Sequence, residues 1–207
     1  MIEKIKKYKI PIIILLSIII TIITIRVMTT DELLIDKIAY KLFVEKLRTP
    51  SLNNLMKIIA TISNTPATVI FIILLLIFIK NKKVALTIPI NLLIITSINQ
   101  ILKLIFQRPR PLGYRLLEIG EYSFPSGHAM TSMALYGLLI YLAYKLVKNK
   151  NLKVLFITIS IFMIIIIGIS RIYLGVHYCS DVLVGWSLSI IYLIIYINIL
   201  KKYKIVS

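Results

Sequence analysis

Residues 155–200 read LFITISIFMIIIIGISRIYLGVHYCSDVLVGWSLSIIYLIIYINIL, two apolar runs joined by a short polar segment. Each run, about Leu155 to Tyr173 and about Asp181 to Leu200, is long enough to cross a bilayer as a helix. His177 and Asp181 are four residues apart, so on a helix they share a face, where the carboxylate can fix the tautomer of the imidazole. A carboxylate kept between apolar runs indicates a functional site, although it could also serve only to cap the last helix.

The composition places the whole chain in a membrane. Of its 207 residues, 59% are hydrophobic, and they gather in runs of membrane-spanning length. The net charge of +17 would fit nucleic-acid binding in a soluble protein. Here the basic residues lie between apolar runs, where they set membrane topology, and no nucleic-acid-binding module is visible. The single cysteine, Cys179, excludes an intrachain disulfide and a cysteine-rich metal site.

We expect an all-α, polytopic membrane protein with one domain over residues 1–207. The first of six predicted transmembrane helices is an uncleaved span, because no small-residue cleavage site follows its apolar run. The second is expected to bend near Asn64-Thr65-Pro66, since proline removes a backbone donor. The predicted spans are residues 10–28, 52–79, 84–106, 126–147, 155–173 and 181–200.

A different kind of helix is predicted at about residues 31–48. Large apolar residues alternate there with charged ones. The apolar set is Leu34, Ile35, Ile38, Leu42 and Leu47, and the charged set is Asp36, Lys37, Lys41, Glu45 and Lys46. Amphipathic helices of this kind lie along a membrane face. The segment could equally pack over the other helices as a lid, and the pattern does not separate the two.

Lysine-rich segments predict the topology. Six spans put both termini and the turns at 80–83 and 148–153 on one side, and all four segments are rich in lysine. Positive charge marks the cytoplasmic side. We therefore expect a multi-pass cell-membrane protein with cytoplasmic termini. The 31–48 helix and the loops at 107–125 and 174–180 then lie outside the cytoplasm.

Three cations at this outer side suit a phosphate. Lys103, Arg110 and Arg171 have no nearby carboxylates in the sequence to neutralise all of them. Arginine offers a planar fork that matches phosphate oxygens, and lysine adds a point charge. Arg108 and Arg115 are interpreted instead as basic loop residues that meet lipid headgroups.

The start of the fourth span and the two histidines complete this set. Ser126 and Gly127 begin a helix, whose free N–H groups and positive dipole end attract anions. His128 and His177 are the only histidines. One can attack phosphorus, and the other can protonate the leaving oxygen. No cluster of carboxylates or cysteines is available in the sequence for a metal, so we expect no metal or other cofactor, and catalysis by fixed cations and dipoles.

These residues form three signatures, Lys103-x6-Arg110-Pro111, Pro125-Ser126-Gly127-His128 and Ser170-Arg171-x5-His177-x3-Asp181. Complete and in this order over residues 103–181, they resemble the signatures of the type 2 phosphatidic acid phosphatase (PAP2) superfamily. The six-span layout is similar to that of its membrane members. The resemblance implies that His177 is the nucleophile of a phosphohistidine, oriented by Asp181, and that His128 protonates the leaving group. It also implies that no divalent metal is needed and that the phosphoryl oxygens are held by Lys103, Arg110, Ser126, Gly127 and Arg171.

The expected function is therefore metal-independent hydrolysis of a lipid phosphate or pyrophosphate at the outer membrane face. Similar proteins act on undecaprenyl pyrophosphate, phosphatidylglycerophosphate or phosphatidic acid, and the residues do not choose among these lipids. The same phosphohistidine could instead pass its phosphoryl group to a lipid or sugar acceptor, as in a phosphotransferase. A vanadate-dependent haloperoxidase is excluded because those relatives are soluble.

A non-enzymatic transporter or anion-binding membrane protein is the weaker alternative. Transporters often carry paired interrupted spans in two halves, whereas only the second predicted span has a central proline here. The expected partners are the bilayer and a lipid phosphate substrate. No nucleic acid is expected, and no protein partner can be predicted.

Overall fold

The computed structural model describes residues 2–30, 32–113 and 115–206. Nearly all of these residues are helical, and the described ranges contain no strand, only an isolated bridge between Pro109 and Tyr122. The elements are α1 (Ile2–Thr29), α2 (Leu34–Tyr40), the π-helix η1 (Lys41–Lys46), α3 (Pro50–Ile62), α4 (Thr65–Phe78), α5 (Lys82–Phe106), α6 (Gly127–Leu146), α7 (Lys150–Tyr173) and α8 (Cys179–Lys202). The predicted all-α fold is confirmed.

The expected multi-pass membrane architecture is also confirmed. Five helices, α1 and α5 to α8, are long and apolar enough to cross a membrane, and α3 with α4 forms a pair bent by 55° that would make a sixth span. The bend falls where it was predicted. The Asn64 side chain accepts a hydrogen bond from the Ala67 N–H at 3.0 Å and starts α4, with Pro66 in its first turn. A cap and a proline together end one helical segment and begin the next.

Several helices extend beyond the apolar runs that predicted them. α1 begins at Ile2 rather than at residue 10, and α7 begins at Lys150 rather than at residue 155. In α7 the Asn149 side chain accepts hydrogen bonds from the N–H groups of Asn151 and Leu152. Hydropathy marks the part of a helix that lipid surrounds, whereas capping side chains fix where the helix starts.

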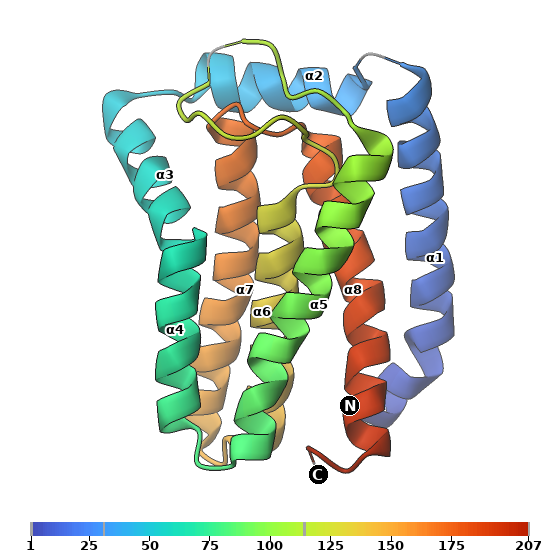
Figure 1. Ribbon diagram of the computed structural model, residues 1–207, viewed down its shortest axis with the longest axis vertical. Helices are drawn as coiled ribbons and strands as arrows, with labels where there is room; N and C mark the ends of the chain where they lie inside the picture. The colour runs from blue at the N-terminus through green and yellow to red at the C-terminus, as the bar shows by residue number, and fades with distance from the viewer. Residues whose placement is uncertain (1, 31, 114, 207) are drawn as a thin grey trace.

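The bundle is built around α6. In Figure 1, α4 to α8 stand upright side by side, α1 runs along one edge against α8, and both termini lie at the same end. α6 packs against α5, α7 and α8. Ile88 of α5, Met130 and Leu138 of α6 and Leu193 of α8 belong to one buried apolar cluster between these helices. This core fixes α5, α6 and α8 relative to one another, and so fixes the positions of their ends.

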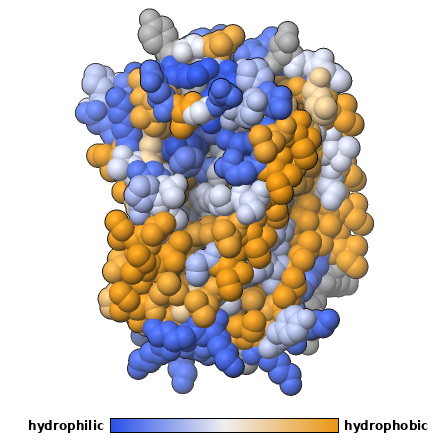
Figure 2. Space-filling view, in the orientation of Figure 1, coloured by the Kyte–Doolittle hydropathy of each residue, from blue (hydrophilic) through white to orange (hydrophobic). Residues whose placement is uncertain are grey.

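The outer surface is suited to lipid. Figure 2 shows an apolar band across the middle of the face in view, with hydrophilic residues concentrated at the two ends. α4 buries none of its residues, and Ile70, Ile77 and Phe78 are among its exposed side chains. Such a continuous apolar surface matches a hydrocarbon environment, and a helix satisfies its own backbone hydrogen bonds there.

α2 lies across the end of the bundle opposite the termini, over α7 and α8 (Figure 1). The predicted amphipathic helix corresponds to α2 and η1, while Asp31 falls outside the described residues. Leu34 and Ile38 are 74% and 58% exposed, whereas Asp36 is 3% exposed. The expectation that Asp36 belongs to a polar outer face is therefore wrong, because its carboxylate is bound inside the protein.

Close packing of α7 on α8 gives a test of this arrangement. A methyl group added at Gly168 would overlap the ring of Trp186, so we expect Gly168→Ala to destabilise the protein by about 1–3 kcal/mol through overpacking. Thermal unfolding in detergent, followed by the fluorescence of Trp186, the only tryptophan, measures the effect. Gly120→Ala is the matched control, since nothing lies within 4 Å of a methyl group there. Equal melting temperatures for the two variants would contradict the packing.

Candidate active site

The three signatures meet at the end of the bundle that α2 covers. Lys103 lies in the last turn of α5 and Arg171 in the last turn of α7, while Ser126 and Tyr178 cap the starts of α6 and α8. Successive spans run in opposite directions, so these two C-terminal ends and two N-terminal ends share one side of the bundle (Figure 1). The topology thus brings together residues that are distant in the chain.

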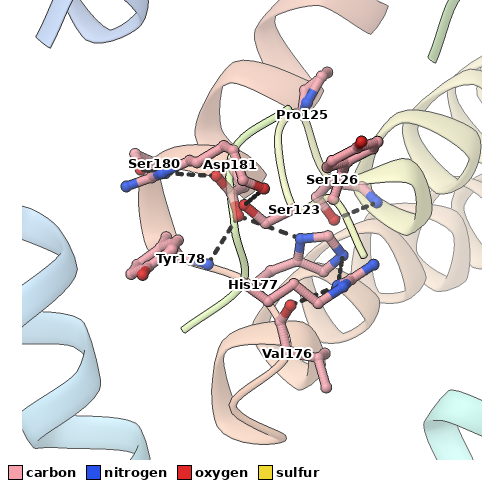
Figure 3. A network of polar contacts seen from close by, with 12 residues as sticks. Ser123, Pro125, Ser126, Val176, His177, Tyr178, Ser180 and Asp181 are labelled. Atoms are coloured by element: carbon pink, nitrogen blue, oxygen red, sulfur yellow. Dashed lines mark hydrogen bonds and ion pairs between the residues drawn. The ribbon is translucent and has the colours of Figure 1, made fainter. Parts of the chain in front are cut away.

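His177 is held from both sides of its ring (Figure 3). It is 3% exposed, and its Nδ1 lies 3.3 Å from Asp181 Oδ2, which also accepts the Tyr178 N–H at 2.9 Å. Its Nε2 lies 3.2 Å from Arg110 Nη1. A guanidinium can only donate, so Nε2 is the acceptor and Nδ1 carries the proton. The nitrogen away from Asp181 therefore presents a lone pair.

The surroundings keep the His177 imidazole neutral at pH 7. Burial is the main reason that its pKa falls to about 4. The charges of Arg110 and Lys103 lower the pKa further, while the hydrogen bond to Asp181 and its charge oppose the shift. Burial also lowers the pKa of Arg110, against the charge of Asp181. A neutral imidazole beside charged guanidinium groups is the state required of a nucleophile that meets an anion.

Lys103 and Arg110 are anchored by backbone carbonyl groups. Lys103 Nζ donates to the Tyr122 carbonyl at 3.0 Å. Arg110 Nη1 donates to the Val176 carbonyl at 2.6 Å, and its Nε donates to the carbonyl of Gly120. Carbonyl groups orient these side chains without neutralising them. Both cations therefore keep their charge available to an anion.

Arg171 is the most buried of the three predicted cations, at 1% exposed. Its Nε donates to Ser170 Oγ at 3.1 Å, and its Nη2 is buried without a partner among the described residues. A buried donor without an acceptor costs about 1–3 kcal/mol. Moreover, none of the three cations has a carboxylate oxygen within 4.0 Å in the described part of the chain. This arrangement favours a bound anionic oxygen.

The start of α6 adds backbone donors at the same place. Ser126 is fully buried, its Oγ accepts the Ala129 N–H at 3.4 Å, and its own N–H donates to the Asp181 carbonyl at 3.1 Å. Gly127 sits against Asn99, whose Oδ1 would lie 2.8 Å from any added Cβ. Only glycine fits this close approach. The N-terminal end of α6 is thus fixed beside the start of α8, with its dipole directed toward the cations.

His128 lies near the three cations and also lines an apolar cavity. The three cations act on it electrostatically, and its side chain lines a cavity of about 320 Å³. The cavity lies between the α3–α4 bend and the helices α6 and α7. Its lining includes Ser63, Phe71, Tyr136 and Met163. His128 therefore stands between the charged centre and a space suited to a hydrocarbon chain.

Arg108 differs from our expectation. It does not meet lipid headgroups, because it is 6% exposed and binds two carboxylates. Its Nη1 donates to Asp181 Oδ1 at 2.6 Å, and its Nη2 donates to Asp36 Oδ2 at 3.0 Å. Its guanidinium also lies 3.8 Å from the centre of the Tyr178 ring. Arg115, in contrast, is exposed at the surface as expected.

Asp36 is the second residue that sequence reasoning missed. Its Oδ1 accepts the Ser180 N–H and its Oδ2 accepts the Ser180 hydroxyl, both at 2.8 Å. The repeated Arg-Pro in residues 108–111 is a local signal that could have singled out Arg108 beside Arg110. No such signal marks Asp36, because Arg108 is 72 positions away from it and Ser180 is 144 positions away.

A second cavity, of about 540 Å³, lies where the end of α1, the start of α2 and residues 108–112 come together. Charged and polar groups line it, including Glu32, Lys37, Arg108, Arg110 and Tyr178. Across the described ranges, no group of three or more histidine, cysteine, aspartate or glutamate side chains is placed to hold a metal ion. The site thus contains two histidines, the two buried carboxylates that Arg108 joins, and four cations in all, which are Lys103, Arg108, Arg110 and Arg171.

Two curated proteins resemble the chain. It is 38% identical over 99 residues to phosphatidylglycerophosphatase B of Bacillus subtilis, in a match that covers 45% of this chain and 47% of the relative. It is 30% identical over 145 residues to an undecaprenyl-diphosphatase of Sulfolobus acidocaldarius, covering 67% of this chain and 66% of the relative. These matches thus span about half and just under two thirds of the curated relatives.

Solved structures share the fold. A crystal structure of a transmembrane PAP2-type phosphatidylglycerolphosphate phosphatase from Bacillus subtilis superposes with a TM-score of 0.81 at 26% identity, covering 94% of this chain and 97% of that one. The crystal structure of Aquifex aeolicus LpxE gives a TM-score of 0.64 at 25% identity, with coverages of 77% and 92%.

The sequence model of the PAP2 superfamily matches residues 84–205, which is more than half of the chain. The match includes α6 to α8, all of α5 except its first two residues, and all three signatures. The protein belongs to the PAP2 superfamily.

Proposed function

We propose that the protein is a membrane lipid phosphate phosphatase that hydrolyses a phosphomonoester or diphosphate through a phosphohistidine. The single observation that carries this proposal is the geometry of His177. Its Nδ1 faces Asp181, and its Nε2 lone pair faces Arg110. The names of the two curated relatives, phosphatidylglycerophosphatase B and undecaprenyl-diphosphatase, support hydrolysis of a lipid phosphate as the reaction class.

The first step forms a bond between His177 Nε2 and phosphorus while the bond from phosphorus to the leaving oxygen breaks. His128 takes up a proton once the phosphate anion lies beside it, and gives that proton to the leaving oxygen. The N–H groups of Arg110 turn from Nε2 to the phosphoryl oxygens as phosphorus approaches. Lys103, Arg171 and the start of α6, at Ser126 and Gly127, hold the other oxygens, whose negative charge they stabilise.

The second step releases phosphate. A water molecule attacks phosphorus as neutral His128 accepts a proton from it, the P–N bond breaks, and inorganic phosphate leaves. Asp181 keeps the Nδ1–H of His177 in place throughout and stabilises the positive ring that forms with the P–N bond. His128 thus regains in the second step the proton that it gave in the first, and His177 returns to its neutral state.

The substrate class follows from the two sides of His128. The cations on one side suit a phosphate or diphosphate, and the apolar cavity on the other suits the chain of a lipid leaving group. The bend between α3 and α4 borders this cavity, so a lipid could enter it sideways from the bilayer. Phosphatidylglycerophosphate, undecaprenyl pyrophosphate and phosphatidic acid all meet these requirements.

We further propose that the termini are cytoplasmic and that the site lies on the outer side of the cell membrane. The lysine-rich turns at 80–83 and 148–153 lie at the end that carries the termini. The candidate site lies at the other end, under α2. This charge asymmetry is the basis of the orientation.

Phosphate release tests the reaction. We expect purified protein in detergent with EDTA to release inorganic phosphate from at least one of the three lipids. His177→Ala should lower the rate on the order of 10³-fold or more, because the nucleophile is lost. His128→Ala should slow a lipid substrate much more than nitrophenyl phosphate, whose leaving group needs little protonation.

Lys46→Gln is the control, since it removes an exposed cation that lies outside the proposed phosphate-binding set. If folded wild-type protein releases no phosphate from any lipid, or if His177→Ala is as active as wild type, the proposal fails. Transfer of phosphate to an added alcohol without release would instead indicate a phosphotransferase.

The protonation state of His177 can be measured directly. In a His128→Gln protein, His177 is the only histidine, and NMR of its ring should give a pKa near 4. Asp181→Asn should lower this pKa further, because the carboxylate favours the charged ring. In the His128→Gln protein unfolded in denaturant, the pKa of His177 should be about 6.5. A pKa near that value in the folded protein would contradict a buried, neutral imidazole.

Labelling tests the orientation. In a Cys179→Ser background, a cysteine at the exposed Glu118 should react with a membrane-impermeant maleimide in intact cells. A cysteine at the exposed Asn149 should react only after permeabilisation, because the 148–153 turn is expected in the cytoplasm. The reverse pattern would invert the proposed topology.

A further inference from the structure

Beneath α2 lies a buried chain of charges that includes two residues outside the three signatures. Asp36, Arg108 and Asp181 are 3%, 6% and 0% exposed. Arg108 joins the two carboxylates, with its Nη1 2.6 Å from Asp181 Oδ1 and its Nη2 3.0 Å from Asp36 Oδ2. Charges buried to this extent are strongly unfavourable unless they are paired. Here one of the paired carboxylates is Asp181, which binds His177 Nδ1.

We propose that Asp36 and Arg108 are positioning residues for phosphoryl transfer, which hold Asp181 and, through it, His177. The inference rests on the proposed function for its effect on rate. By this inference α2 belongs to the active site, because its residue Asp36 binds Arg108.

The first step concerns the orientation of the Asp181 carboxylate. Its Oδ2 serves the His177 Nδ1 and the Tyr178 N–H, and its Oδ1 serves Arg108. With both oxygens bound, the carboxylate cannot rotate about its own axis. Loss of Arg108 would free Oδ1 and allow Oδ2 to leave the imidazole. Arg108 is in turn fixed by Ser180 Oγ at 2.8 Å and by stacking over the Tyr178 ring.

The second step concerns charge. A guanidinium paired with Asp181 alone would offset the negative charge that must stabilise the His177 ring once it bonds to phosphorus. Asp36 shares that guanidinium, so the three groups carry a net charge of about −1 at pH 7. Asp181 therefore retains negative charge for His177. Removing the charge of Asp36 leaves Arg108 to act on Asp181 alone, which disfavours the positive ring.

The third step connects α2 to the helix that bears Asp181. Both oxygens of Asp36 bind Ser180, one at its N–H and the other at its hydroxyl. Ser180 lies in the first turn of α8, where the positive end of the helix dipole favours a carboxylate. Asp36 thus fixes the first turn of α8 from outside that helix. Displacement of α2 would release Arg108 and this turn together.

Asp36→Asn tests the inference, with Glu45→Gln as the matched control. Glu45 is an exposed carboxylate of η1, the segment that continues α2. We expect Asp36→Asn to lower kcat for phosphate release about 10-fold to 100-fold, because the reacting groups lose their alignment. KM should stay within about twofold of wild type, since no group proposed to hold phosphate is changed. Asp36→Glu should restore part of the rate, and Glu45→Gln should equal wild type.

Arg108→Lys is the second variant, should Asp36→Asn fail to fold. Lysine keeps the positive charge but lacks the fork that binds two carboxylates at once, so a similar fall in kcat is expected. A double variant Asp36→Asn with Arg108→Lys should be little slower than the slower single variant, because both changes break one unit. Multiplied losses, or a kcat equal to that of Glu45→Gln, would overturn the inference.

A measurement without turnover separates this inference from the proposed reaction. In the His128→Gln protein, the NMR shift of the His177 Nδ1–H proton reports the strength of its hydrogen bond to Asp181 Oδ2. We expect a strongly downfield proton with Glu45→Gln, and a clear upfield shift with Asp36→Asn or Arg108→Lys, because the carboxylate turns away from the ring. Equal shifts in all of these proteins would overturn the positioning role, whether or not wild-type protein releases phosphate.

Discussion

The buried carboxylate of Asp181 is the constraint on which the rest of the site depends. It is fully buried at the first turn of α8, where an ionised group is stable only if donors surround it. The donors come from the 107–125 loop, from the turn before α8 and from the His177 ring. Their positions require α5 and α7 to end, and α8 to begin, at the same side of the bundle. The fold therefore serves to assemble donors around one charge, and the orientation of His177 follows from that assembly.

Unbalanced positive charge completes the chemistry. Arg108 is paired with two carboxylates. Carbonyl and hydroxyl groups orient Lys103, Arg110 and Arg171, which have no carboxylate oxygen within 4.0 Å among the described residues. An anion that enters gains from three cations that are already desolvated and oriented, so little reorganisation is needed when it binds. Arg110 lies against His177 Nε2 and must exchange that contact for a phosphoryl oxygen. In the proposed reaction, the same movement of the Arg110 side chain thus binds the phosphate and frees His177 Nε2 for attack.

The spans, the bend at Asn64 and the nature of the signature residues could be predicted from sequence, because apolar runs, caps and motifs are local. The helix ends could be placed only roughly, since Asn149 starts α7 before its apolar run begins. The ion pair of Asp36 and Arg108 could not be predicted, because its two members are 72 positions apart in the chain. On α2 the pattern also misled: Leu34 and Ile38 face outward while a carboxylate faces inward. Hydropathy ranks side chains by the free energy of transferring them alone into an apolar medium. It therefore does not account for a buried carboxylate whose charge is paired.

The two cavities give the proposed reaction a direction. The lining of the apolar cavity of about 320 Å³ includes His128, whereas that of the polar cavity of about 540 Å³ includes Arg108 and Arg110. In-line attack by His177 places the leaving oxygen opposite Nε2, so the group that protonates that oxygen should border the space that holds the lipid chain. His128 has this position. A phosphate released toward the polar cavity moves along guanidinium groups, while the dephosphorylated lipid stays against apolar side chains. The two products would then separate into the two phases that suit them, water and bilayer, without crossing each other.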